Sequence, residues 1–147
     1  MFENFLAQNL PLLIKLLVAM FLGGFLGIER TIAHKTAGLR TYSIVSLGSC
    51  LFIIASIMAM EQFPQGGVNP LYVMAAIATG IGFLCGGVII YHENKLEGLT
   101  TAAGMWVSAG VGITVGFGYF TLATMATILT IFMFSELLWD VESKLKG

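Results

Sequence analysis

The sequence predicts an all-α protein, a polytopic bundle of five transmembrane helices packed through glycines. Three observations lead to this fold class. Hydrophobic residues make up 57% of the 147 residues and charged residues only 10%, whereas about a quarter of a soluble domain is charged. The apolar residues fall into five runs, each close to the 20 residues that a helix needs to cross a bilayer. Glycine occurs 18 times, which suits helices that pack backbone against backbone in lipid.

The boundaries of the predicted helices follow from the ends of the apolar runs. The runs cover about residues 10–28, 41–60, 70–91, 99–118 and 119–139. They are too long and too uniformly apolar for the alternating strands of a membrane barrel, and a helix satisfies its backbone groups internally. We therefore expect one membrane domain over residues 1–147, with no soluble C-terminal domain.

The residues that flank the runs support these boundaries. No basic segment precedes the first run, so we expect a permanent span rather than a cleaved signal peptide. A turn-rich stretch with Pro64, Gly66 and Gly67 separates the second and third runs. Thr100 and Thr101 stand where they can cap the first turn of the fourth helix.

The charge balance excludes several classes of protein. Seven Lys and Arg stand against eight Asp and Glu, which leaves no basic surface for nucleic acid. Intrinsic disorder and a secreted disulfide scaffold are excluded by the composition. Cys50 and Cys85 both lie inside apolar runs with no second Cys or His at ligand spacing. We expect them to be small buried side chains.

Small residues recur at every fourth position in three of the predicted helices. Lipid tails are as apolar as leucine, so helices associate in a membrane through close van der Waals approach at such residues. The predicted packing residues are Gly23, Gly27, Gly82, Gly86, Gly104, Ser108, Gly112 and Gly116. We expect helix 99–118 to be central and helix 119–139, which lacks glycine, to be peripheral. Alternatively, such a stripe also forms a homodimer or binds a partner helix.

Polar and charged residues gather at one end of the predicted bundle. An ionisable residue close to a span is a functional candidate, and the candidate cluster consists of Glu29, Arg30, Arg40, Thr41, Thr100 and Thr101. A short loop joins the first two helices, so we expect Glu29 to engage Arg40, the start of helix 99–118, or both, with Arg30 as the competing partner. The charges could form a packing ion pair or a working site.

No catalytic or cofactor-binding constellation is present in the sequence. There is no phosphate-binding glycine loop, no metal pair of His and Glu, and no nucleophile beside a base. We therefore expect neither an enzyme nor a cofactor. Glu93 and Glu97 are weak candidates for holding Mg²⁺, which prefers carboxylate oxygens, and a solvated loop is the favoured explanation for them.

Four sequence stretches are more specific than composition. Gly23 and Gly27 stand before a Glu-Arg pair, and an Ala-Gly-Leu-Arg-Thr element follows. The stretches lie at residues 23–30, 35–41, 80–89 and 98–103, the last with Trp106 and Ala109 beyond it. In order and spacing, over roughly residues 12–118, they resemble the membrane domain of the MgtC/SapB family.

The resemblance implies an inner-membrane protein linked to growth at low Mg²⁺ and to bacterial virulence. It also implies a regulator that acts on other membrane proteins, including the proton-translocating ATP synthase. The implied partners are lipid and either a second copy of the chain or another membrane protein. The alternatives are a transporter or channel for Mg²⁺ or another small solute, and a structural subunit of a larger membrane complex.

The chain departs from the family pattern at the start of the third helix. Many members have Asp-Pro-x-Arg there, followed by Gln. Here the positions read Asn69-Pro70-Leu71-Tyr72, with Ala76 in place of the Gln. The acid, the base and the amide are all replaced.

Charge placement predicts the orientation in the membrane. The segments that follow helices 10–28, 70–91 and 119–139 hold six Lys and Arg, and the segments at the opposite side hold none. Basic loops stay in the cytoplasm, so we expect the N-terminus outside and the C-terminus inside. Lys15 would then snorkel to the outer interface or face the bundle. A reporter that works only in the cytoplasm should be active when it is fused to the C-terminus. Activity of a C-terminal reporter that works only outside the cell would contradict the topology.

Overall fold

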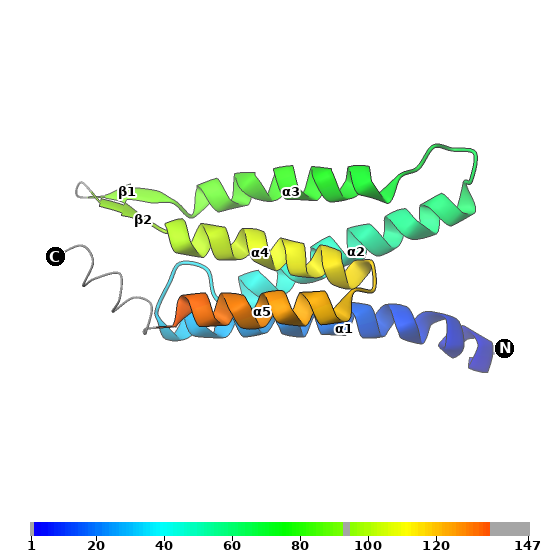
Figure 1. The fold of residues 1–147 in the computed structure, drawn as a ribbon, viewed down its shortest axis with the longest axis horizontal. Helices are drawn as coiled ribbons and strands as arrows, with labels where there is room; N and C mark the ends of the chain where they lie inside the picture. The colour runs from blue at the N-terminus through cyan, green and yellow to red at the C-terminus, as the bar shows by residue number, and fades with distance from the viewer. Residues whose placement is uncertain (1, 93–94, 136–147) are drawn as a thin grey trace.

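The computed structural model describes residues 2–92 and 95–135, and its helices run in alternating directions along one bundle (Figure 1). The elements are α1 (Phe2–Ile32), α2 (Leu39–Gln62), α3 (Pro70–Gly87), β1 (Ile90–His92), β2 (Lys95–Glu97), α4 (Leu99–Gly116) and α5 (Phe120–Phe134). Helices α1 to α4 are long and apolar enough to cross a membrane. The predicted all-α membrane bundle is therefore confirmed. Helix α5 has 15 described residues, and residues 136–139 of the predicted fifth helix lie outside the described part.

One end of the bundle collects the α1–α2 loop (residues 33–38) and the β1–β2 hairpin (residues 90–97), and we call it the hairpin end (Figure 1). Helices α1, α3 and α5 end there, and α2 and α4 begin there. Arg30 lies in the last turn of α1, Lys35 in the α1–α2 loop, Arg40 in the first turn of α2 and Lys95 in β2. These four basic residues therefore share one end of the bundle.

Helix α1 begins at Phe2, before the predicted start at residue 10, and it continues one turn beyond the predicted boundary at residue 28. Lys35 N–H bonds the carbonyl of Arg30 at 2.9 Å, and His34 N–H bonds that of Thr31 at 3.1 Å. His34 has φ +53°. This is the hydrogen-bond pattern of a Schellman cap, with His34 in the left-handed position that usually takes Gly. The backbone cap ends the helix, so its end does not follow the end of the apolar run.

Helix α3 ends at Gly87, so the prediction of a helix reaching residue 91 is wrong. The successive Gly86 and Gly87 have poor helix propensity, and the β-branched Val88, Ile89 and Ile90 favour extended backbone. Residues 90–92 instead pair antiparallel with residues 95–97, with Tyr91 opposite Leu96.

Helix α4 begins after Gly98, and the predicted capping by Thr100 and Thr101 is wrong. Gly98 occupies the N-cap position with φ +89°, and no side chain caps the helix. A Cβ at Gly98 would collide with the carbonyl of Val88. The base of the hairpin therefore sets the start of α4 through its backbone.

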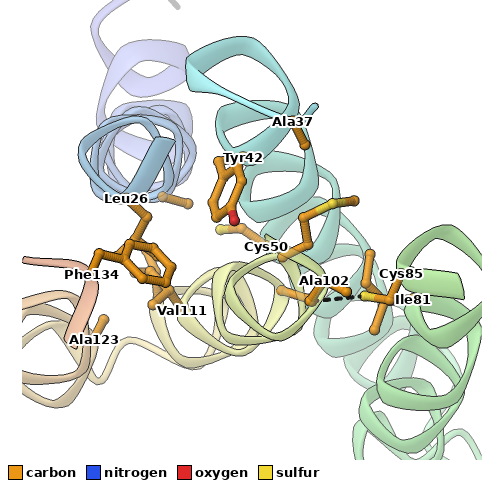
Figure 2. Packing of buried hydrophobic residues seen from close by; sticks show 14 of the residues in the cluster. Leu26, Ala37, Tyr42, Cys50, Ile81, Cys85, Ala102, Val111, Ala123 and Phe134 are labelled. Atoms are coloured by element: carbon orange, nitrogen blue, oxygen red, sulfur yellow. Dashed lines mark hydrogen bonds between the residues drawn. The ribbon is translucent and has the colours of Figure 1, made fainter. Parts of the chain in front are cut away.

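Helices α1, α2 and α4 form the centre of the bundle through close backbone contacts. A Cβ at Gly23 of α1 would lie 2.6 Å from the carbonyl oxygen of Tyr42 in α2. A Cβ at Gly112 of α4 would collide with the backbone of Ser46 in α2, and one at Gly116 would lie 2.8 Å from the side chain of Ile53. Figure 2 shows the apolar side chains that pack between these helices.

The glycines of α3 do not pack in this way. A Cβ at Gly82 or Gly86 would meet no described atom within 4 Å. Helix α3 contacts α4 through Ile81 and Cys85 instead, and the Cys85 thiol donates to the carbonyl of Ala102 at 3.2 Å (Figure 2). The prediction that Gly82 and Gly86 pack helices of this chain is therefore wrong, because the repeat faces outward.

Lys15 faces the bundle at the end opposite the hairpin end. Its Nζ donates a hydrogen bond of 3.0 Å to the carbonyl oxygen of Gly116, at the last residue of α4. The last carbonyls of a helix lack helical partners, and a cation is favourable beside them. Lys15 therefore ties α1 to the end of α4.

The packing of α4 is tested by alanine at two neighbouring glycines. Gly112→Ala should destabilise the protein by about 1–3 kcal/mol, because the new methyl group overpacks against the Ser46 backbone. Gly110→Ala is the matched control, since a Cβ there meets no described atom within 4 Å. It should be neutral or slightly stabilising through helix propensity. Thermal unfolding in one detergent measures both, and equal melting temperatures would contradict the central position of α4.

Candidate functional site

The end of α1 packs closely against the start of α2 through two residue pairs, Thr31 with Gly38 and Gly27 with Leu39. The Thr31 hydroxyl donates to the carbonyl of Gly27 at 3.0 Å and accepts the N–H of Leu39 at 2.8 Å. Gly38 lies so close to Thr31 that a Cβ there would collide with the hydroxyl, and a Cβ at Gly27 would lie 2.7 Å from the Leu39 backbone. The Gly-Ile-Glu-Arg-Thr and Ala-Gly-Leu-Arg stretches therefore form one structural unit.

Glu29 pairs with its neighbour Arg30, not with Arg40. The Arg30 Nε donates to a Glu29 carboxylate oxygen. Arg40 is exposed, and no ion pair joins it to Glu29 among the described residues. The predicted Glu29–Arg40 contact is therefore wrong, because Arg40 is exposed in the first turn of α2 whereas Glu29 is partly buried beside Arg30. The alternative contact of Glu29 with the start of α4 is not found among the described residues either. Arg30, the competing partner, forms the ion pair with the Glu29 carboxylate.

Arg30 also connects α1 with the end of α5. Its guanidinium lies 4.0 Å from the centre of the Phe134 ring, and Nη2 lies 3.4 Å from the Phe134 carbonyl oxygen. Arg30 is only 6% exposed. A buried guanidinium needs such compensation, and stacking on an aromatic face supplies part of it.

Tyr42 joins α2 to α4 at this end through its hydroxyl and its backbone carbonyl, and it was not among the residues predicted from the sequence. Its hydroxyl donates to the carbonyl of Thr101 at 2.8 Å. Its own carbonyl accepts from the Ser108 hydroxyl at 2.8 Å. Figure 2 shows the ring pointing from α2 into the space between α1 and α4. Gly104 makes room for it, since a Cβ there would lie 2.6 Å from the Tyr42 hydroxyl oxygen.

The sequence did carry a signal for Tyr42. Tyr42, Ser46 and Ser49 repeat at helical spacing within an apolar run, and all three are buried. A polar stripe of this kind must face protein rather than lipid, and a buried tyrosine hydroxyl needs a partner. Phe134 gave no such signal, because nothing in an apolar run distinguishes it from its neighbours.

The structure divides the predicted polar cluster into two parts. Arg30 and Thr101 are buried and Glu29 is partly buried, so they lie in the interior of the hairpin end. Arg40, Thr41 and Thr100 are exposed. The proximity of the first two helices accounts for the first part, and the direction of each side chain was not predictable from spacing.

A pocket of about 550 Å³ opens at the α1–α2 loop, and we call it the junction pocket. Its lining includes the basic residues His34, Lys35 and Arg40 together with Thr41. The described residues contain no group of three or more His, Cys, Asp or Glu that could hold a metal ion. Glu97 is exposed on β2, and Glu93 lies outside the described residues.

The departure at the start of α3 has a local structural role. The Asn69 side chain accepts the N–H of Leu71 at 2.9 Å, and Pro70 follows as the first helical residue. Asn and Asp are equally good at this capping position. Asn69 therefore supplies the cap that an aspartate would, without its charge.

Comparisons with known proteins show related sequences over most of the chain. A family model described as the MgtC family matches residues 16–140. Protein MgtC of Salmonella typhimurium is 42% identical over 119 residues, which cover 81% of this chain and 49% of that protein. An uncharacterized protein of Haemophilus influenzae is 39% identical over 127 residues, covering 83% of this chain and 53% of that protein.

A third relative carries a different name. The putative magnesium transporter YhiD of Escherichia coli is 34% identical over 125 residues, which cover 81% of this chain and 57% of that protein. The chain thus spans about half the length of these relatives. No solved structure matches it.

The two arginines of the predicted cluster should differ in their effect on stability. Arg30→Gln should cost about 1–3 kcal/mol, because it removes charged hydrogen bonds and the contact with Phe134. Arg40→Gln should stay within about 0.5 kcal/mol, as is usual for an exposed side chain. Melting temperatures in detergent without added anionic lipid would measure this. A larger loss for the Arg40 variant would mean that the interior pair is wrongly assigned.

Proposed function

Because the chain belongs to the MgtC family, we propose that it is an inner-membrane regulatory protein that binds other membrane proteins, and that it is not an enzyme. The bound protein is a second copy of the chain or another membrane protein, such as the proton-translocating ATP synthase. In this proposal the hairpin end, with its basic residues, faces the cytoplasm.

The close packing of α1, α2 and α4 carries the proposal. Gly23, Gly112 and Gly116 bring the three helices together with no space for a further Cβ at these positions. The hydroxyls of Tyr42 and Ser108 are bonded across the helices within the bundle. A solute path needs polar groups that face water, whereas these groups are occupied by the chain itself. The packed centre supports a role exerted at the outer surface.

The outer surface of α3 has the features of a helix-contact face. Gly82 and Gly86 are exposed and meet no described neighbour, and Phe83 between them is 85% exposed. Small residues let another helix approach closely in lipid. This face supports binding of a membrane partner, and it is where the regulatory contact is proposed.

Magnesium transport is the second candidate function. It is favoured by the printed name of the Escherichia coli relative, a putative magnesium transporter. Mg²⁺ is bound through carboxylates and retained water, and Glu29 is the described carboxylate nearest the interior, where it pairs with Arg30. Transport would then require an oligomeric pore lined by backbone carbonyls.

Reconstitution separates the two candidates. The purified full chain is inserted into liposomes that enclose a Mg²⁺-sensitive dye, and external Mg²⁺ is then added. The proposal expects uptake equal to that of protein-free liposomes. Uptake that rises with the amount of protein, and that Gly112→Ala reduces more than Gly110→Ala, would overturn it.

Photo-crosslinking in cells tests the contact on α3. A photoreactive amino acid replaces Phe83, and the control position is Phe52 of α2, which is 60% exposed. Position 83 should give a discrete protein adduct that position 52 does not give. Lipid adducts alone at position 83 would contradict a protein contact on this face.

A further inference from the structure

We propose that the junction of α1 and α2 binds an anionic phospholipid, with the phosphate in the junction pocket and one acyl chain in an adjoining groove. The inference goes beyond the proposed function, since it stands whether or not the chain contacts another protein. It rests on two neighbouring hollows whose linings match the two halves of such a lipid.

The polar hollow is built for an anion. His34, Lys35 and Arg40 line the junction pocket, and no Asp or Glu is among its lining residues. The Thr41 side chain adds a hydroxyl at the start of α2. These basic side chains are exposed, so they can reach a ligand without breaking an internal contact. Arg and Lys are the residues that bind phosphate oxygens.

The backbone of α2 adds to this charge. Gly38 is its N-cap and gives no side-chain hydrogen bond, and the first turn contains no acidic residue. Thr31 satisfies the N–H of Leu39. The positive end of the helix is therefore turned toward the pocket without a carboxylate to neutralise it. This contribution supports the side chains but does not define the site.

The second hollow is an apolar groove of about 400 Å³ between α1 and α2. Phe21, Phe25 and Ile28 line it from α1, and Ile44 lines it from α2. Gly24 lies at its base, where a Cβ would be 2.9 Å from the Ser43 hydroxyl oxygen. The volume suits one acyl chain rather than another helix, which is about 10 Å across.

The two hollows are continuous. Leu39 and Arg40 line both of them. The junction pocket lies at the loop between two helices that can each cross the membrane, which is the level of the lipid head groups. Basic pockets between transmembrane helices bind anionic head groups. A soluble phosphate would occupy only the polar hollow. A zwitterionic lipid would bring its positively charged group beside the basic residues of the pocket. The polar and apolar hollows together therefore favour an anionic lipid.

Native mass spectrometry of the delipidated full chain in mild detergent tests the proposal. Phosphatidylglycerol is compared with phosphatidylcholine that carries the same acyl chains. The proposal expects a single tight adduct of phosphatidylglycerol and weaker binding of phosphatidylcholine. Inorganic phosphate and glycerol phosphate should neither bind nor compete. Equal binding of the two lipids would overturn the proposal, and so would competition by the free phosphates, which would mark a site for a soluble anion.

Charge variants locate the head group. The double variant Lys35→Gln with Arg40→Gln should bind phosphatidylglycerol about 25-fold more weakly, at about fivefold per basic residue. Lys95→Gln is the control, because Lys95 is an exposed basic residue of the same end that does not line the pocket. It should bind within about twofold of the unchanged chain. If Lys95→Gln weakened phosphatidylglycerol binding as much as the double variant, the attraction to basic residues would be diffuse. That result would overturn the assignment of the head group to the junction pocket.

A groove variant locates the acyl chain. Ile28→Trp fills the groove with a larger side chain, and Ile32→Trp is its control, since Ile32 is 72% exposed and lines neither hollow. The adduct should be lost with the first change and kept with the second. If Ile28→Trp does not fold, the charge variants still test whether the lipid binds at the junction pocket. Full binding by a folded Ile28→Trp protein would overturn the assignment of the groove.

Discussion

The backbone contact between Gly112 of α4 and Ser46 of α2 is the constraint on which the rest of the bundle depends. Lipid gives these helices no hydrophobic reason to associate, so their stability comes from close approach and from hydrogen bonds across the interface. Gly23 brings α1 to the same point of α2, where a Cβ would lie 2.6 Å from the Ser46 Cβ. Three helices therefore meet at one level of the bundle, and their spacing there fixes the distances at both ends.

The polar contacts at the two ends follow from that spacing. At the hairpin end, the Tyr42 hydroxyl reaches Thr101 only because α2 and α4 lie close enough for a side chain to span them. At the other end, Lys15 reaches the carbonyl of Gly116 in the same way. Each contact satisfies a group that would be costly if left unpaired away from water. The close packing and the hydrogen bonds therefore support each other.

Helix α3 stands apart from this arrangement. It is held to α4 by Ile81 and Cys85 and by the Trp106 indole, which donates to the carbonyl of Ala78 at 3.3 Å. Its glycines face outward. The same small-residue repeat thus has opposite consequences in α3 and α4, because what a glycine permits depends on whether a neighbour is present. The outward repeat and the lipid-facing groove between α1 and α2 leave two distinct surfaces to the surrounding membrane.

The sequence by itself determined the membrane-bundle class, the order of the helices and the family, because these depend on the length of apolar runs and on local motifs. It also placed Glu29, Arg30 and Thr101 at one end. Only the tertiary structure decided that Arg30 pairs with Glu29 while Arg40 is exposed. It also decided that Tyr42 joins α2 to α4 and that a β-hairpin follows α3. Those outcomes depend on helix rotation and on backbone caps such as that at His34. A linear pattern of apolar residues carries neither the rotation of a helix nor the direction in which its chain leaves the last turn.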